Sequence, residues 1–239
     1  MDETRTSFLR GLHDGFPICL GYFSVAFAFG IFAVSSGLDV MQAVLISMAN
    51  TTSAGQMAAV PLLAGGGSLL ELGLTQLVIN LRYSLMSVSL SQKLGPAVRL
   101  CDRFVVAFVN TDEVFAVASS RPGTLTAPYL YGLILTPYVG WSFGTLIGAL
   151  AGNILPAALV SALGIAIYGM FLAIVIPAAK QSRATLFCVL FAVGLGCMFR
   201  YVPVLAQVSE GFVVILCAVV ASAVFALLAP VPEGEVTDS

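Results

Sequence analysis

The sequence predicts an all-α polytopic membrane protein, and three observations support this prediction. The chain of 239 residues is 59% hydrophobic and only 9% charged, whereas soluble proteins are about 45–50% apolar and about 25% charged. The mean hydropathy is +1.02 over the whole length, so the apolar residues exceed what one buried core needs. The apolar runs are also long enough for membrane helices and lack the strict alternation of barrel strands.

Composition excludes several classes of function. A net charge of −2 leaves no basic surface for phosphate backbones, so no nucleic-acid partner is expected. The five cysteines form no CxxC pair and no cluster with histidine, so neither a disulfide framework nor a metal site is expected. No nucleotide-binding motif or other cofactor motif is present. An enzyme is not expected either, because the single histidine, His13, lies in the N-terminal segment, away from any membrane serine.

Eight apolar segments reach or approach the length of about 20 residues that a membrane helix needs. They are residues 16–35, 40–63, 68–91, 104–120, 128–151, 155–177, 184–200 and 211–229. Residues 1–15 are predicted to form a cytoplasmic N-terminal segment, and residues 230–239 a disordered acidic tail, also cytoplasmic. Residues 16–229 then form a single transmembrane domain. Its first run is too long for a signal-peptide core and is expected to stay as a span.

The distribution of positive charge argues against eight full crossings. With a cytoplasmic N-terminus, eight crossings would place Lys93, Arg99 and Arg103 outside, against the positive-inside rule. Four polar residues, 50–53, interrupt the segment 40–63. We therefore predict a broken, re-entrant pair of half-helices over 40–63, which moves the loop of residues 92–103 to the cytoplasm.

The same treatment of segment 155–177 brings the next basic loop inside and leaves only Arg121 and Arg200 outside. The preferred architecture is therefore about six spanning helices plus two broken or re-entrant segments. Seven or eight full spans remain the alternative.

A faint internal repeat supports this architecture. A shift of 114 residues aligns 29–61 with 143–175, with Phe-Gly and several small residues in common. The repeat halves would be about 16–120 and 128–229, in opposite orientations, as in the inverted repeats of many transporters.

The first polar group inside the membrane lies in the break of segment 40–63. A half-helix that begins near Ser53 would direct its backbone N–H groups at an anion such as a carboxylate. Thr52, Ser53, Gly55 and Gln56 are therefore candidate substrate-binding residues. The alternative is a kinked helix whose hydroxyl groups serve helix packing.

The second polar group is one face of segment 68–91. Its members step by three or four residues: Gln76, Asn80, Ser84, Ser87 and Ser91. Tyr83 lies beside Asn80, and both are candidate binding residues. Arg82 lies about 200° round the helix from Asn80 and needs an acidic partner, a carbonyl cluster or a substrate carboxylate. The alternative is an arginine that reaches the interface.

The third polar group is Thr111-Asp112-Glu113 within segment 104–120. Adjacent carboxylates in an apolar segment are costly unless they are paired, protonated or hydrated. Asp112 and Glu113 lie 100° apart on a helix and should have different roles: one pairs with Arg82, and the other carries a proton or meets a substrate ammonium group. The alternative is an interfacial helix with both acids in water.

Four glycines predict close helix packing in segment 128–151. Gly132, Gly140, Gly144 and Gly148 follow one another at spacings of 8, 4 and 4 residues, which places them on one helix face. Their partner is either another helix of the chain or a neighbouring subunit.

The chain resembles the AzlC-type branched-chain amino acid exporters. The stretches that carry the resemblance, in family order, are DGFPICLGYFSVAFAFG, SAGQM, NLRYSLM and TDEVFA, and the similarity covers about residues 8–229. TDEVFA and the Pro-x-x-x-Gly-Tyr pattern of the first span are the more specific motifs. The chain departs from the family in the order of the small residues around Gln56, and in Asn80 and Tyr83, where relatives also carry Asp and His.

The resemblance implies a large permease subunit of the bacterial inner membrane that exports leucine, isoleucine, valine and related residues such as methionine. It also implies a small AzlD-type membrane partner; a homo-oligomer is a further alternative. The leading function from the sequence is thus a secondary transporter driven by an ion or proton gradient. The rival is a channel-like or assembly subunit without its own substrate site, in which the polar groups would face a partner.

Overall fold

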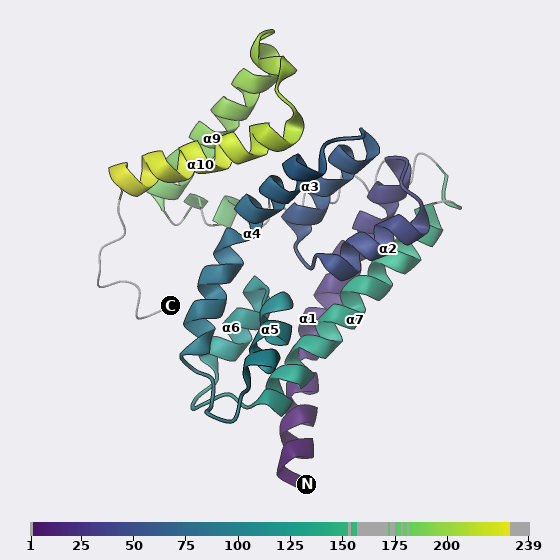
Figure 1. Cartoon of the computed structure of the whole chain (residues 1–239), viewed down its shortest axis with the longest axis vertical. Helices are drawn as coiled ribbons and strands as arrows, with labels where there is room; N and C mark the ends of the chain where they lie inside the picture. Colours follow the sequence, from purple (N-terminus) through teal and green to yellow (C-terminus); the bar gives the residue numbers. More distant parts are fainter. Residues whose placement is uncertain are drawn as a thin grey trace.

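A computed structural model describes residues 2–152, 154–156, 172, 175–177, 179–180 and 182–229. Over these residues the protein is all-α and polytopic, as predicted (Figure 1). Its elements are α1 (Asp2–Ser35), α2 (Val40–Ala49), α3 (Ser53–Ala64), α4 (Leu69–Ser91), α5 (Leu100–Phe108), α6 (Asp112–Ser120), α7 (Ala127–Gly152), α9 (Arg183–Tyr201), the 3-10 turn η1 (Leu205–Gln207) and α10 (Glu210–Leu228). Most of the segment 155–177 and the whole tail 230–239 lie outside the described residues, so the expectations for them stay predictions.

Four of the described helices, α1, α7, α9 and α10, are long and apolar enough to cross a membrane. Helix α4 has 23 residues, or about 34 Å of axis, and so reaches a similar length with a more polar face. The predicted number of about six spans is not reached among the described residues. One reason is that segment 104–120 is not a single helix.

The centre of the fold is the parallel pair α1 and α7. A Cβ atom at Gly132 would lie 2.2 Å from the carbonyl oxygen of Phe8, and one at Gly148 would lie 2.0 Å from that of Phe27. The pairing advances in the same direction along both helices, so the helices run parallel. The glycine face predicted for 128–151 therefore packs within the chain, where only glycine permits this approach of two backbones.

Helices α2 and α3 form a re-entrant hairpin, as expected for segment 40–63. Ala43 of α2 and Val60 of α3 share a buried cluster with Ala149 near the end of α7. Asn50, between the two helices, accepts a hydrogen bond on its carbonyl from Trp141 Nε1 at 3.2 Å, about two turns back along α7. The hairpin thus enters beside the C-terminal end of α7, turns within the fold and returns.

Helices α5 and α6 form a second hairpin, and this differs from the expectation of one short span over 104–120. The helix is interrupted at residues 109–111. Lys93 Nζ, in the loop before α5, donates hydrogen bonds to the carbonyls of Ser119 and, at 2.7 Å, of Arg121. The end of α6 therefore returns to the side from which α5 started. The polar residues Asn110 and Thr111 lie in this break, much as residues 50–52 lie in the break of the first hairpin.

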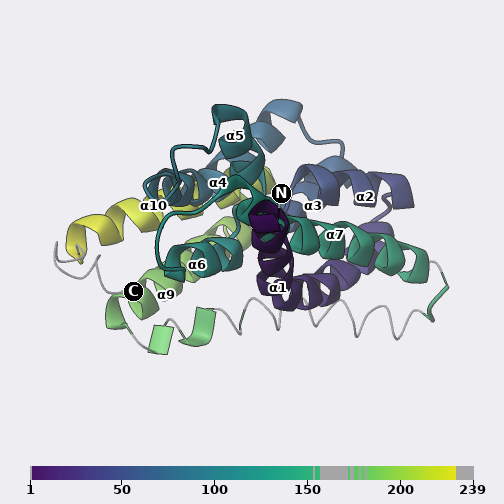
Figure 2. The same cartoon turned by 90° about the horizontal axis from the view of Figure 1, so that it is seen from below.

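The two hairpins enter from opposite ends of the α1–α7 pair, and their breaks touch. Thr51 Oγ1 donates to the carbonyl oxygen of Phe108 at 3.3 Å. Figure 2 shows α6 to one side of α1, and α2 alongside α7. The two hairpins thus point in opposite directions, and both lie within the first predicted half, residues 16–120. Helices α1 and α7, which begin the two predicted halves, run parallel to one another.

Arg121 follows α6 directly, and its position differs from the expected one on the outside. Its guanidinium group lies 3.4 Å from the carboxylate of Asp14 in α1, and the Tyr129 hydroxyl donates to the same carboxylate at 3.0 Å. Arg121 is therefore at the N-terminal end of α1, together with Lys93. At the other end, buried Glu71 of α4 accepts hydrogen bonds from the Ser209 hydroxyl and from Gly211 N, which attaches α10 to the first turns of α4.

Candidate functional site

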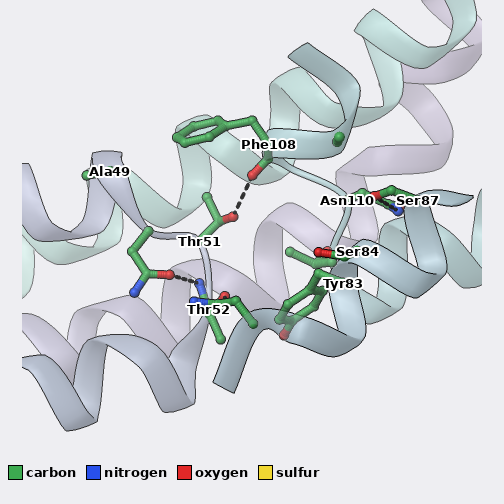
Figure 3. Close-up of a pocket in the computed structure, with 12 residues that line it drawn as sticks. Ala49, Thr51, Thr52, Tyr83, Ser84, Ser87, Phe108 and Asn110 are labelled. Atoms are coloured by element: carbon green, nitrogen blue, oxygen red, sulfur yellow. Dashed lines mark hydrogen bonds between the residues drawn. The ribbon is translucent and has the colours of Figure 1, made fainter. Parts of the chain in front are cut away.

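A pocket of about 480 Å³ lies where the two helix breaks meet the polar face of α4 (Figure 3). The residues that line it are Ala49, Asn50, Thr51, Thr52, Asn80, Tyr83, Ser84, Ser87, Ala107, Phe108, Asn110 and Thr111. None of these side chains is charged, and nine of them carry a hydroxyl or amide group. The lining is therefore polar and neutral.

The first break is held against α4 by amide groups. Asn50 Nδ2 donates to Gln76 Oε1 at 2.8 Å, and Asn50 Oδ1 accepts from the backbone N–H of Thr52 at 3.2 Å. Thr52 Oγ1 donates to Asn80 Oδ1 at 2.6 Å, and Gln76 Nε2 donates to the carbonyl of Gly55 at 2.9 Å. The bond to Thr52 N gives a partner to a backbone group of the break, and the bonds to Gln76 and Asn80 attach the break to α4.

The structure separates the residues that sequence analysis grouped at this break. Thr52 lines the pocket, whereas Ser53, Gly55 and Gln56 do not. Gln56 is 1% exposed and donates to the hydroxyl of Ser47, behind the break. A Cβ atom at Gly55 would lie 2.6 Å from both Asn50 Nδ2 and Gln76 Oε1, so glycine permits the close approach of α4. Gly55 and Gln56 thus support the site from behind.

The second break was not recognised as one from the sequence. Asn110 Nδ2 donates to Ser87 Oγ of α4 at 3.0 Å, and both Asn110 and Thr111 are buried. Thr111 is the N-cap residue of α6, as Thr52 is of α3, and neither side chain makes a capping hydrogen bond. A signal was present in the sequence, because Asn-Thr occurs at 50–51 and again at 110–111.

Arg82 has the acidic partner that it needs, and that partner is Asp112. Arg82 Nη2 lies 2.8 Å from Asp112 Oδ2 and donates to the Tyr83 hydroxyl at 2.7 Å. The guanidinium carbon lies 4.7 Å from the centre of the Tyr83 ring. Arg82 and Asp112 do not line the pocket, but Tyr83 does. The ion pair therefore acts on the pocket through the position of Tyr83.

Glu113 has a different environment from Asp112, in keeping with their 100° separation. Its carboxylate accepts a short hydrogen bond from the Tyr22 hydroxyl of α1. The Tyr22 ring packs edge-on against Trp141 at 5.2 Å, and Trp141 bonds the carbonyl of Asn50. Glu113 is thus linked to the first break through two aromatic rings and does not line the pocket itself.

The ends of four half-helices surround the pocket. Helices α3 and α6 begin at its lining residues Thr52 and Thr111, and α2 and α5 end at Ala49 and Phe108. Unpaired backbone N–H groups and positive dipole ends favour an anion at the first two, and carbonyl ends favour a cation at the other two. Among the described residues no group of three or more His, Cys, Asp or Glu side chains could hold a metal ion.

A second, apolar pocket adjoins the first. It has a volume of about 220 Å³ and lies between α4 and α5, where apolar residues such as Val88, Leu90 and Phe104 make up most of the lining and Arg103 is its charged member. Both pockets share Ser87, Ala107 and Asn110. The two volumes together can receive a molecule with a polar head and an apolar body.

Comparison with known proteins agrees with a membrane protein of this kind. The sequence profile of the AzlC family, described as AzlC protein, matches residues 17–155. The chain is 29% identical over 185 residues to the Escherichia coli strain K12 protein "Inner membrane protein YgaZ", covering 74% of this chain and 76% of that protein. It is 36% identical over 175 residues to an Archaeoglobus fulgidus protein described as an uncharacterized membrane protein, covering 72% and 76%.

A Helicobacter pylori strain 26695 protein with the same description is 28% identical over 161 residues, which cover 61% of this chain and 66% of that protein. No solved structure matches the chain. The profile match covers more than half of the sequence, and it includes both helix breaks and the polar face of α4. The chain therefore belongs to the AzlC family of membrane proteins.

Proposed function

We propose that this chain is a secondary transporter that exports branched-chain or related hydrophobic amino acids, and that it is not an enzyme. The observation that carries the proposal is the neutral polar pocket between two re-entrant hairpins of opposite direction. Broken helices that meet within the membrane are the usual way in which secondary transporters build a substrate site. A membrane transport role also fits the AzlC family.

The pocket suits a zwitterion. The starts of α3 and α6 favour the substrate carboxylate, and the ends of α2 and α5 favour the ammonium group. The adjoining apolar pocket of about 220 Å³ offers room for an aliphatic side chain. Since no charged side chain lines the polar pocket, a substrate with no net charge is favoured over an ion.

The sequence-based site residues take distinct roles in this proposal. Thr52, Asn80 and Tyr83 contact the substrate, because they line the pocket. Arg82 and Asp112 position Tyr83 through their ion pair. Three residues of the first hairpin shape the break without contacting substrate: Ser53, Gly55 and Gln56. Glu113, bonded to Tyr22, is the carboxylate proposed to carry a coupling proton.

The proposed location is the inner membrane of a bacterium, because the Escherichia coli relative is named as an inner membrane protein. Lys93 and Arg121 lie at the N-terminal end of α1, which supports a cytoplasmic position for that end. A small AzlD-type membrane subunit is the proposed partner, with a homo-oligomer as the alternative assembly.

Amino acid efflux tests this proposal. Cells are preloaded with leucine-, valine- or methionine-containing dipeptides, with this chain expressed alone and then with its small partner. Faster efflux only in the co-expressing cells is the expected result. An Asn80→Leu variant of equal abundance should lose the acceleration, because Asn80 lines the pocket and holds Thr52. No efflux of any amino acid, with both proteins present in the membrane, would contradict the substrate assignment.

A second candidate is a channel-like or assembly subunit without its own substrate site. The observation that favours it is the ion pair of Arg82 and Asp112, which lies outside the pocket with side chains 56% and 46% exposed. In that case the charged groups would face a partner subunit. Deletion of the partner gene would then abolish accumulation of this chain, rather than efflux alone.

A further inference from the structure

The two helix breaks share a dipeptide but differ in how their asparagines are bonded. Asn50 uses both polar atoms of its amide, since Nδ2 donates to Gln76 and Oδ1 accepts from Thr52 N. Asn110, in the equivalent place of the second hairpin, uses only Nδ2, which donates to Ser87. Its Oδ1 has no hydrogen-bond partner although the residue is only 2% exposed.

A buried amide atom without a protein partner is costly unless a bound molecule offsets its desolvation. The conclusion does not depend on which way the amide is turned. The Ser87 hydroxyl can donate as well as accept, so one polar atom of Asn110 stays unpaired in either orientation. Asn110 therefore presents a hydrogen-bonding group that the rest of the described chain does not use.

The position of Asn110 indicates what would use it. Asn110 lines both the polar pocket and the apolar pocket, and so stands at the junction between them. A substrate with its head group in the first and its side chain in the second would pass directly by this amide. Asn110 also lies two residues before the start of α6, next to the N-cap residue Thr111.

We propose that Asn110 is a substrate-contacting residue whose Oδ1 accepts a hydrogen bond from the ammonium group of the transported amino acid. The inference rests on the proposed transport function and adds the specificity-determining residue for the α-amino group. Asn50 is less suited to this role, because both of its amide atoms already have partners within the protein. Ser87 then serves as a positioning residue, which fixes the amide from α4.

Binding of L-leucine and of its α-hydroxy analogue, 2-hydroxy-4-methylpentanoate, tests this assignment. The full chain is purified with its small partner subunit into lipid nanodiscs, and both ligands are titrated by calorimetry. The wild-type protein should prefer leucine, because only leucine carries the ammonium group. Asn110→Leu should weaken leucine binding roughly tenfold or more, as expected for one hydrogen bond to a charged group, and should remove most of the preference.

Asn110→Asp is the matched second variant, because it keeps an acceptor oxygen at the place of Oδ1, while its second oxygen can accept from the Ser87 hydroxyl. It should retain the preference for leucine, and it keeps the test decisive if Asn110→Leu does not fold. An unchanged ratio of the two affinities in Asn110→Leu would overturn the role of Asn110 while leaving the transport function standing. If Asn110→Leu does not fold, loss of the preference in Asn110→Asp would overturn it equally. A wild-type protein that binds neither leucine, valine nor methionine would overturn the proposed function and this inference with it.

Discussion

Removal of the ion pair between Arg82 and Asp112 is the sharpest test of how the site is supported. The two groups lie 2.8 Å apart, and Arg82 also holds the Tyr83 hydroxyl at the pocket. Exposed pairs are worth about 0.2–1 kcal/mol, whereas breaking a fully buried pair costs about 3–5 kcal/mol. With side chains 56% and 46% exposed, we expect a coupling of about 1–2 kcal/mol, or roughly a 5- to 30-fold change in rate.

Initial rates of leucine efflux measure this coupling in a double-mutant cycle at equal membrane abundance. Arg82→Ala should lower the rate without loss of insertion, and Asp112→Asn should cause little further loss in the Arg82→Ala background. Glu113→Gln is the matched control, because Glu113 bonds Tyr22 rather than Arg82. Its effect should add to that of Arg82→Ala. Additive effects of Arg82 and Asp112, or unchanged efflux in Arg82→Ala, would refute the reasoning.

Three further substitutions test the frame around the pocket. Gly148→Val should lower the melting temperature in detergent or prevent accumulation, because its Cβ would lie 2.0 Å from a backbone carbonyl oxygen of α1. Such overpacking costs about 1–3 kcal/mol or more. The control is Gly73→Val, which has nothing within 4 Å of its Cβ and should leave the melting temperature nearly unchanged. Tyr22→Phe should lower efflux less than Glu113→Gln does, since it removes the hydrogen bond to the carboxylate but keeps the group proposed to carry the proton; a wild-type rate in Glu113→Gln would contradict that role. Trp141→Phe should reduce stability by about 1 kcal/mol, because it removes the hydrogen bond to the first break; an unchanged denaturation midpoint would show that this bond is not needed.

The break at residues 50–53 could be predicted because its four polar residues interrupt an otherwise apolar run. The break at residues 109–111 was not predicted. Asn110 and Thr111 are directly followed by two acids, and all four polar residues were assigned to a single helix. Helix periodicity placed Asp112 and Glu113 on different faces. It could not show which acid meets Arg82, since that depends on how α4 and α6 cross.

The class of protein, the glycine face of α7 and the broken first hairpin could all be predicted before the fold was known. Those features follow from local composition and spacing, which a single segment carries on its own. The folded chain was needed to show that Asn110 joins Asn50 at one pocket, that Arg82 pairs with Asp112, and that Arg121 lies beside the N-terminal half of α1. Each of these depends on two helices distant in sequence, and their contact is set by packing of the whole bundle rather than by any residue pattern within one helix.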